Sequence, residues 1–277
     1  MNTENYSPPV DKLLALGDPR DSREWPNYLE FGLTSEQIPD LIRMVTDKEL
    51  NEAPGDSREV WAPLHAWRAL GQLRAGAAIE PLMRLFHEQE DDDWAGTELP
   101  TVFGMIGPPA IPSLAAYMAD ESRGMFPRIS AVESLENIAK MHPDARAECV
   151  AIITRQLERF AQQEPTFNAF LISSLVELGA VESASLIERA FAADSVDVSI
   201  GGDWDDVQVD LGLKEPGEKQ IRQQRLLEEL QRALTAPPQP LKSKSSSNVS
   251  HKVGAKAKAK AKRKQAKLSR KKNRRRR

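Results

Sequence analysis

Cysteine is nearly absent from this chain of 277 residues, in which Cys149 is the single copy. One thiol cannot close an intrachain disulfide, and it cannot supply the two or more thiolates of a zinc ribbon or a dithiol redox site. The sequence therefore excludes a disulfide framework and fits a reducing compartment. Cys149 itself falls on a predicted helix, where we expect a small buried core residue.

Long hydrophobic runs are also missing. No window approaches the roughly 20 apolar residues of a membrane span, and the first 18 residues contain Pro8 and Pro9 but no apolar run of leader length. We therefore expect a cytoplasmic protein without a membrane span. Strand-like alternation is equally rare. Its one instance is SVDVSI at residues 195–200, whose alternation allows an extended segment after the last repeat.

Motifs of the common enzyme classes are absent as well. The chain has no G-x-S-x-G, no phosphate-binding P-loop, no G-x-G-x-x-G and no H-E-x-x-H. We therefore predict a protein that is not an enzyme, has no cofactor and holds no metal.

What the chain does have is a strong segregation of charge. Residues 241–277 hold 17 Lys and Arg and no Asp or Glu, although the formal net charge of the whole chain is only -3. The other 21 basic residues and all 41 acidic residues lie in residues 1–240, which gives that part a net charge of -20. An acidic body therefore carries a polycationic segment.

A helical repeat is the clearest pattern in the body. Apolar residues at i, i+3, i+4 and i+7 recur five times, with weaker matches in the last two copies, and the five registers begin at Ile38, Ile79, Ile111, Val150 and Ala184. Successive starts lie 41, 32, 39 and 34 residues apart, which brackets the period of two-helix repeats. Because a single hairpin cannot close a core alone, the pattern predicts an all-α fold, an α-solenoid of stacked hairpins.

Partner helices and turns support this prediction. Second apolar stripes precede the later registers and begin at Trp61, Leu99, Ile129 and Phe170. The short links contain helix-ending residues, such as Gly107 followed by two prolines. Before the first register, Thr34 to Gln37 has the T-x-x-Q form of a capping box.

The segments WAPLHAWRALGQLRAGAAIEPLMRLF (61–86) and FGMIGPPAIPSLAAYM (103–118) resemble HEAT-like repeats first associated with phycobilin lyases. With GGDWDDVQVDLGL (201–213), the body is similar to a bacterial family of HEAT-repeat proteins that has no assigned activity, without the Cys/His SEC-C-type motif that ends some relatives. The resemblance implies about five HEAT-like hairpins. It also implies an alternative function, bilin lyase-like or chaperone activity on the concave solenoid face.

We divide the chain into four parts. Residues 1–33 are a helical lead-in and residues 34–213 are the HEAT-like repeat domain. Residues 214–235 are a capping helix, with leucines on one side that cover the last repeat. Residues 236–277 have almost no large apolar residues, and we expect this tail to be disordered in isolation.

The basic tail is the strongest functional signal, because Lys and Arg neutralise phosphates and release counterions without reading sequence. The residues predicted to bind nucleic acid are Lys256, Lys258, Lys260, Lys262, Arg263, Lys264, Lys267, Arg270, Lys271, Lys272, Arg274, Arg275, Arg276 and Arg277. The expected partners are RNA, DNA or ribosomes. Three alternatives remain: the tail folds back on the acidic body, it only raises solubility, or it is drawn to an anionic membrane surface.

Three clusters in the body have both a functional and a structural interpretation. Residues 87–93 (HEQEDDD) could hold a hard cation, but lack calcium-loop spacing, and Asp93 would cap the helix at Trp94. Trp61, His65 and Trp67 could line a pocket, but fit the repeat core better, with His65 hydrogen-bonded inside. The third cluster is an acidic aromatic patch of Asp203, Trp204, Asp205 and Asp206. It could recognise a basic peptide, and the alternative is an N-cap at Asp203 followed by a packed Trp.

These observations together predict a non-enzymatic scaffold. Its solenoid face would bind a protein partner, and its basic tail would associate with nucleic acid or ribosomes without sequence preference.

Overall fold

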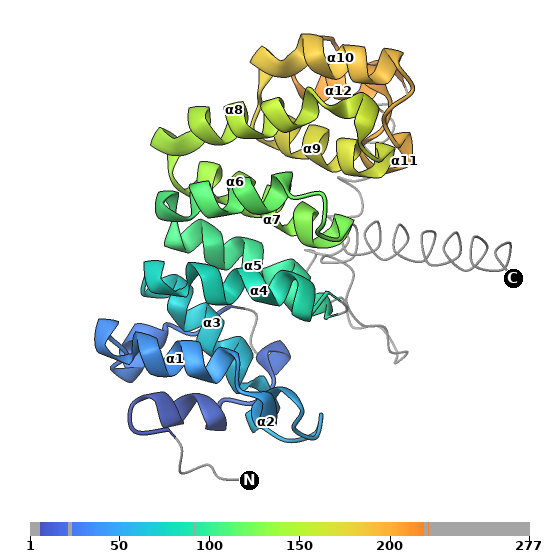
Figure 1. Cartoon of the computed structure of the whole chain (residues 1–277). Coiled ribbons are helices and arrows are strands. Elements are labelled where there is room, and N and C mark those ends of the chain that lie inside the picture. Colours follow the sequence, from blue (N-terminus) through green and yellow to red (C-terminus); the bar gives the residue numbers. More distant parts are fainter. Residues whose placement is uncertain (1–5, 22–23, 91, 219–220, 222–277) are drawn as a thin grey trace, which may run out of the picture.

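The computed structural model describes residues 6–21, 24–90, 92–218 and 221, and within them all regular secondary structure is helical. The helices stack in chain order from the N-terminal end to α10, α11 and α12 at the other end (Figure 1). The predicted all-α solenoid is confirmed.

Two layers of helices build the stack. The first layer consists of α3 (Ala62–Gln72), α5 (Asp93–Ile106), α7 (Met125–Met141) and α9 (Pro165–Glu177). The second consists of α1 (Ile38–Val45), α4 (Ile79–Glu88), α6 (Ile111–Ala119), α8 (Arg146–Leu157) and α10 (Ala184–Ala192). Successive helices of the first layer contact one another. In the second layer, α1, α4, α6 and α8 pack against α3, α5, α7 and α9, respectively, and α10 contacts α8 and α12. The short helices α2 (Lys48–Asn51), α11 (Val198–Gly201) and α12 (Trp204–Asp210) lie outside this alternation.

A single turn of 3-10 helix leads into each second-layer helix. These five turns are η5 (Ser35–Gln37), η7 (Gly76–Ala78), η8 (Pro108–Ala110), η9 (Pro143–Ala145) and η11 (Val181–Ser183). The predicted capping box is confirmed at the first of them, where the Thr34 hydroxyl accepts from the Glu36 amide and the Gln37 side chain accepts from the Thr34 amide. The recurring turn reverses the chain and gives the hairpins a common local geometry.

The N-terminal lead-in is also helical, but in 3-10 turns rather than α-helix. The turns are η2 (Val10–Ala15), η3 (Pro19–Asp21) and η4 (Tyr28–Phe31), and two further 3-10 turns, η6 (Glu59–Trp61) and η10 (Phe160–Gln162), lie between helices. The turns η2 and η4 contact α3, whose first ten residues are buried between the lead-in, α1 and α5. The lead-in therefore closes the N-terminal end of the stack.

The core follows the predicted registers most clearly in α4, where Ile79, Leu82, Met83 and Phe86 are all buried. The weak register predicted from Ala184 is wrong for one member, because Glu188 is exposed. There the buried stripe of α10 consists of Leu186, Ile187 and Ala190.

Glycine allows two first-layer helices to approach closely. A Cβ atom added at Gly104 of α5 would lie 2.9 Å from Asn137 Cβ and 3.0 Å from Met141 Sδ, both on α7. Contacts this short require displacement of α7 side chains, so the contact between α5 and α7 depends on the missing side chain.

Two local predictions are wrong. No extended segment occupies residues 195–200, because the Asp197 carboxylate accepts from the Ser199 amide and hydroxyl and starts helix α11. The cap of α5 is Asp92 rather than Asp93, with its carboxylate accepting from the amides of Trp94 and Ala95. In both cases a short Asp side chain determines the local structure by satisfying free helical amides.

The predicted capping helix (214–235), apart from residues 214–218 and 221, and the predicted tail (236–277) lie outside the described residues. In the described part of the chain, no single helix combines the length and hydropathy of a membrane span. One bent pair, Trp94–Ile106 with Pro108–Ala119, meets those criteria jointly across an angle of 114°.

Candidate binding sites

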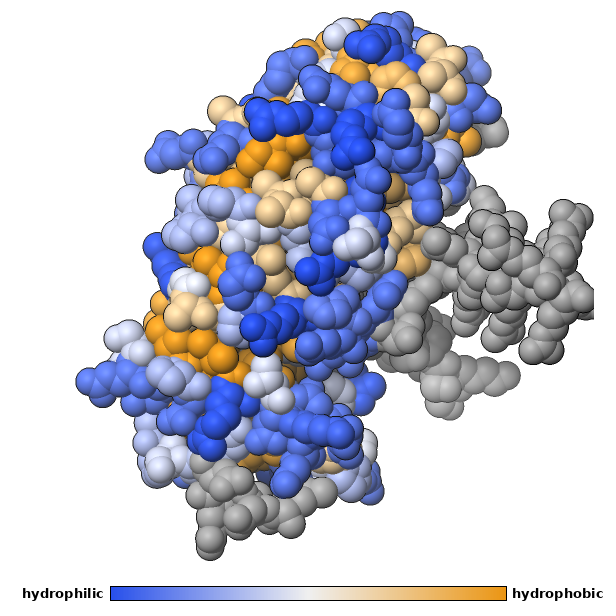
Figure 2. Space-filling view, in the orientation of Figure 1, coloured by the Kyte–Doolittle hydropathy of each residue, from blue (hydrophilic) through white to orange (hydrophobic). Residues whose placement is uncertain are grey.

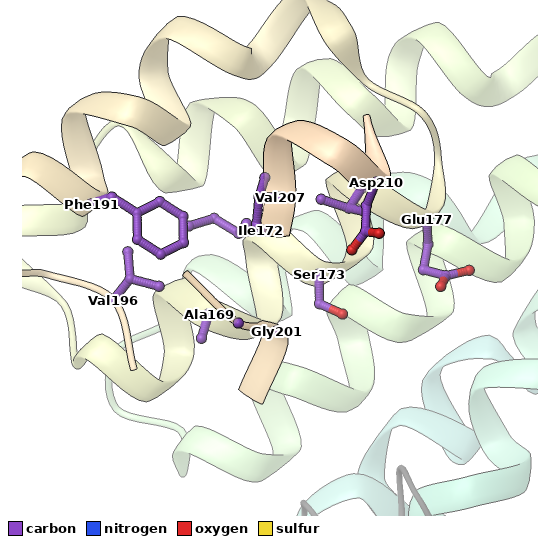
Figure 3. Close-up of a pocket in the computed structure, with 11 residues that line it drawn as sticks. Ala169, Ile172, Ser173, Glu177, Phe191, Val196, Gly201, Val207 and Asp210 are labelled. Atoms are coloured by element: carbon purple, nitrogen blue, oxygen red, sulfur yellow. The ribbon is translucent and has the colours of Figure 1, made fainter. Parts of the chain in front are cut away.

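A cavity of about 100 Å³ opens at the C-terminal end of the solenoid, between α9, α10, α11 and α12 (Figure 3). Its lining residues are Ala169, Ile172, Ser173, Val176, Glu177, Phe191, Val196, Gly201, Gly202, Val207 and Asp210. Pockets for drug-sized ligands measure roughly 300–1,000 Å³. The cavity therefore accommodates a single side chain rather than a cofactor or a bilin.

Two glycines line this cavity. Gly201 is exposed, and no atom lies within 4 Å of the position that an added Cβ would take. The neighbouring Gly202 has a φ of +87°, and a Cβ there would lie 2.7 Å from Asp206 Oδ2. A larger residue is therefore disfavoured at Gly202 by both backbone strain and contact with α12.

The cavity is apolar on one side and acidic on the other. Figure 3 shows Phe191 and Val196 opposite the two carboxylates, Glu177 and Asp210. The Glu177 carboxylate is 58% exposed and pairs with Lys140 Nζ at 2.7 Å. Asp210 has no ion-pair or hydrogen-bond partner among the described residues. Burial, together with the nearby negative charges of Asp206 and Glu177, raises the pKa of the Asp210 carboxyl above its ordinary value.

The predicted acidic aromatic patch lies next to this cavity, and its residues have local structural roles. Asp203 caps α12 in a reciprocal capping box with Asp206. Asp205 accepts from Lys214 Nζ at 2.8 Å, and the half-buried Trp204 packs at 6.1 Å from the Phe191 ring. The interpretation as an N-cap and a packed Trp is confirmed, while recognition of a basic peptide stays a prediction.

The second cluster, Trp61, His65 and Trp67, belongs to the N-terminal interior. The Tyr28 hydroxyl lies 2.6 Å from His65 Nδ1, and His65 Nε2 lies 2.9 Å from the Gly17 carbonyl oxygen. The Gly17 carbonyl can only accept, so Nε2 carries the ring proton and Nδ1 accepts from Tyr28. Burial lowers the pKa of His65, which keeps the ring neutral, and it raises the pKa of Tyr28 to about 12. His65 is thus the hydrogen-bonded interior residue that was predicted.

A buried ion pair adjoins this network. Arg68 Nε donates to Glu98 Oε2 at 2.7 Å, and the Trp67 indole N–H donates to the same oxygen at 3.2 Å. The Arg68 guanidinium also lies over the Trp25 ring, 4.7 Å from its centroid. Arg68 Nε and Nη2 together engage both carboxylate oxygens of Glu98, so the geometry is that of a structural clasp between the lead-in, α3 and α5.

The remaining candidates from the sequence are the possible metal site, Cys149 and the basic tail. Among the described residues, no group of three or more His, Cys, Asp or Glu side chains gathers in a metal-binding arrangement, and residue 91 lies outside that set. Cys149 is fully buried in α8, as predicted, and burial raises the pKa of its thiol to about 11. All fourteen predicted nucleic-acid-binding residues, from Lys256 to Arg277, lie outside the described residues.

No family model, curated protein or solved structure matches this chain. The resemblance to HEAT-like repeat proteins therefore stays a prediction.

Proposed function

We propose that this protein is a non-enzymatic binding scaffold. Its solenoid body holds a protein partner, and its basic segment associates with nucleic acid or ribosomes without sequence preference. The observation that carries this proposal is the division of charge between a body of net charge -20 and a segment with 17 cationic residues in 37.

The architecture supports the scaffold part of the proposal. Stacked hairpins present a long continuous surface, which repeat proteins use to bind partners. The visible face is mostly hydrophilic, with separate hydrophobic patches between the helices (Figure 2). Patches of this kind, surrounded by polar residues, suit contact with another protein.

The chemistry of the basic segment supports nucleic-acid binding. Residues 255–264 alternate Ala and Lys before ending in Lys-Arg-Lys, which gives a high density of charge without aromatic rings for base stacking. Cations spaced in this way neutralise phosphates but cannot read base edges. Binding should therefore depend strongly on salt and weakly on sequence.

A comparison of three species tests this function: the intact chain, the chain ended at Ala236, and a peptide of residues 241–277. If the tail engages about 6 to 10 phosphates, the affinity of the intact chain for duplex DNA or RNA falls by on the order of 10³ to 10⁵ between about 50 and 200 mM salt. Ending the chain at Ala236 removes none of the described core, which runs from Tyr6 to Leu211. Fluorescence anisotropy with two unrelated duplexes provides the measurement. Equal binding by the intact and shortened chains contradicts the proposal.

A further inference from the structure

We propose that the cavity between α9 and α12 binds one lysine side chain from the chain's own basic segment, residues 255–264, and that this contact competes with nucleic acid. The inference rests on the proposed function, because it concerns how tail binding to nucleic acid is regulated.

The shape and polarity of the cavity fit a lysine. Its volume of about 100 Å³ admits one side chain, and its apolar wall, which includes Ile172, Phe191 and Val207, suits four methylene groups. The two carboxylates on the opposite side then lie where the ammonium group would end (Figure 3). An entirely apolar side chain would leave Asp210 desolvated without a counterion.

The electrostatics of the cavity favour a cation. Asp210 lacks a partner among the described residues, and it lies close enough to Asp206 and Glu177 for their charges to disfavour its ionised form. Lys140 neutralises part of the Glu177 charge but gives no hydrogen bond to Asp210. A bound ammonium group would offset the repulsion that Asp210 experiences from these two carboxylates.

The position of the basic segment in the chain favours it as the occupant. Helix α12 lines the cavity and ends at Asp210, and 45 residues separate Asp210 from Lys256. Even with residues 214–235 as the predicted capping helix, the roughly 20 residues that follow it can span up to about 70 Å when extended, so the segment can return to the cavity as a tethered, intramolecular ligand. The neighbours of the lysines in residues 255–262 are mostly alanines, whose small side chains hinder entry into the cavity little.

Zero-length carbodiimide cross-linking of the intact chain tests the contact, because it joins a carboxylate to a lysine only when the two groups touch. We expect an amide between Asp210 and a lysine of residues 255–264 in the monomer. Peptide mass spectrometry would identify it. Asp210→Asn should remove this cross-link. Gly201→Leu, which places a large side chain at the lining of the cavity and keeps the carboxylate, should reduce it. Asp144→Asn is the matched control, since it removes an exposed carboxylate of η9 far along the chain from the cavity.

Binding of the same intact variants to duplex DNA at about 50 mM salt tests the competition. We expect Asp210→Asn and Gly201→Leu to bind about two- to five-fold more tightly than the native chain, the range set by one partly exposed ion pair. Asp144→Asn should show a smaller change. Circular dichroism checks that each variant keeps its helix content.

The outcomes separate the two proposals. Cross-links spread evenly over acidic residues of the body, or found only in dimers, overturn the cavity proposal. The cavity proposal is also overturned if the native chain and the three variants bind DNA equally tightly and the Asp210 cross-link does not form. That result would not contradict the proposed nucleic-acid function. If none of the proteins binds DNA but the Asp210 cross-link forms, the nucleic-acid function fails and the lysine contact stands without its competition.

Discussion

Removing Glu98 should destabilise the protein far more than removing any exposed carboxylate. The side chains of Arg68 and Glu98 are only 4% and 9% exposed, so Glu98→Ala leaves a guanidinium buried without its counterion. Breaking a buried pair in this way costs about 3–5 kcal/mol. The Trp67 indole N–H also loses its acceptor, and an unsatisfied buried donor costs about 1–3 kcal/mol. The two costs overlap, because both arise at one carboxylate, so we expect a loss of about 4 kcal/mol.

A double variant and a surface control isolate the cause. Arg68→Met with Glu98→Leu removes both charges and keeps apolar volume, so only the Trp67 donor stays unsatisfied and the loss should fall to about 1–3 kcal/mol. The control pair, Lys48 and Glu52, is 82% and 68% exposed. Glu52→Gln should therefore change the free energy of unfolding by no more than about 0.5 kcal/mol.

Urea denaturation, monitored by far-ultraviolet circular dichroism, measures these differences. A repeat protein can unfold in more than one step, so the midpoints of the transitions are compared first. Hydrogen exchange of α3 and α5 amides gives a second measure that does not assume a single transition. A Glu98→Ala variant as stable as Glu52→Gln would refute the reasoning. A double variant less stable than Glu98→Ala would show that the charges themselves stabilise the clasp.

Two further predictions concern packing and thiol chemistry. Gly104→Ala should destabilise the fold by up to about 2 kcal/mol, because the short contact with Asn137 outweighs the gain in helix propensity. Gly76 has open space around it, so Gly76→Ala should be neutral or should stabilise the fold by less than about 1 kcal/mol. Thermal or urea unfolding measures both changes. Cys149 should react with a thiol reagent at pH 8.5 only as fast as the protein opens, since its pKa near 11 keeps the buried thiol protonated; full labelling at the rate of an exposed thiol would contradict this.

The fold was largely predictable because helical periodicity is a local signal. The register beginning at Ile79 corresponds residue by residue to the buried face of α4, and the T-x-x-Q pattern at Thr34 locates the first 3-10 turn. The failures were also local. Alternation in residues 195–200 suggested an extended segment, but one carboxylate, that of Asp197, supplies a helix cap that hydropathy patterns do not detect.

The candidate sites were less predictable, because their residues come together only in the folded chain. Arg68 and Glu98 are 30 positions apart on different helices, and neither lies in a recognisable motif. The cavity combines residues as far apart in the sequence as Ala169 and Asp210, which come from several helices. Sequence patterns did locate the acidic patch beside it, since Asp203 to Asp206 are consecutive, but not the unpaired Asp210 that gives the cavity its polarity.

The repeated 3-10 turns also determine how this protein could change length during evolution. Successive second-layer helices begin 41, 32, 35 and 38 residues apart, each after a turn of the same kind. Duplicating or deleting the stretch between two turns would add or remove one whole hairpin and would join surfaces of the same type. The lead-in covers α3 at one end, and α11 and α12 cover α9 and α10 at the other. Whole hairpins could therefore be inserted between the two ends of the array without disturbing either end or the cavity between α9 and α12.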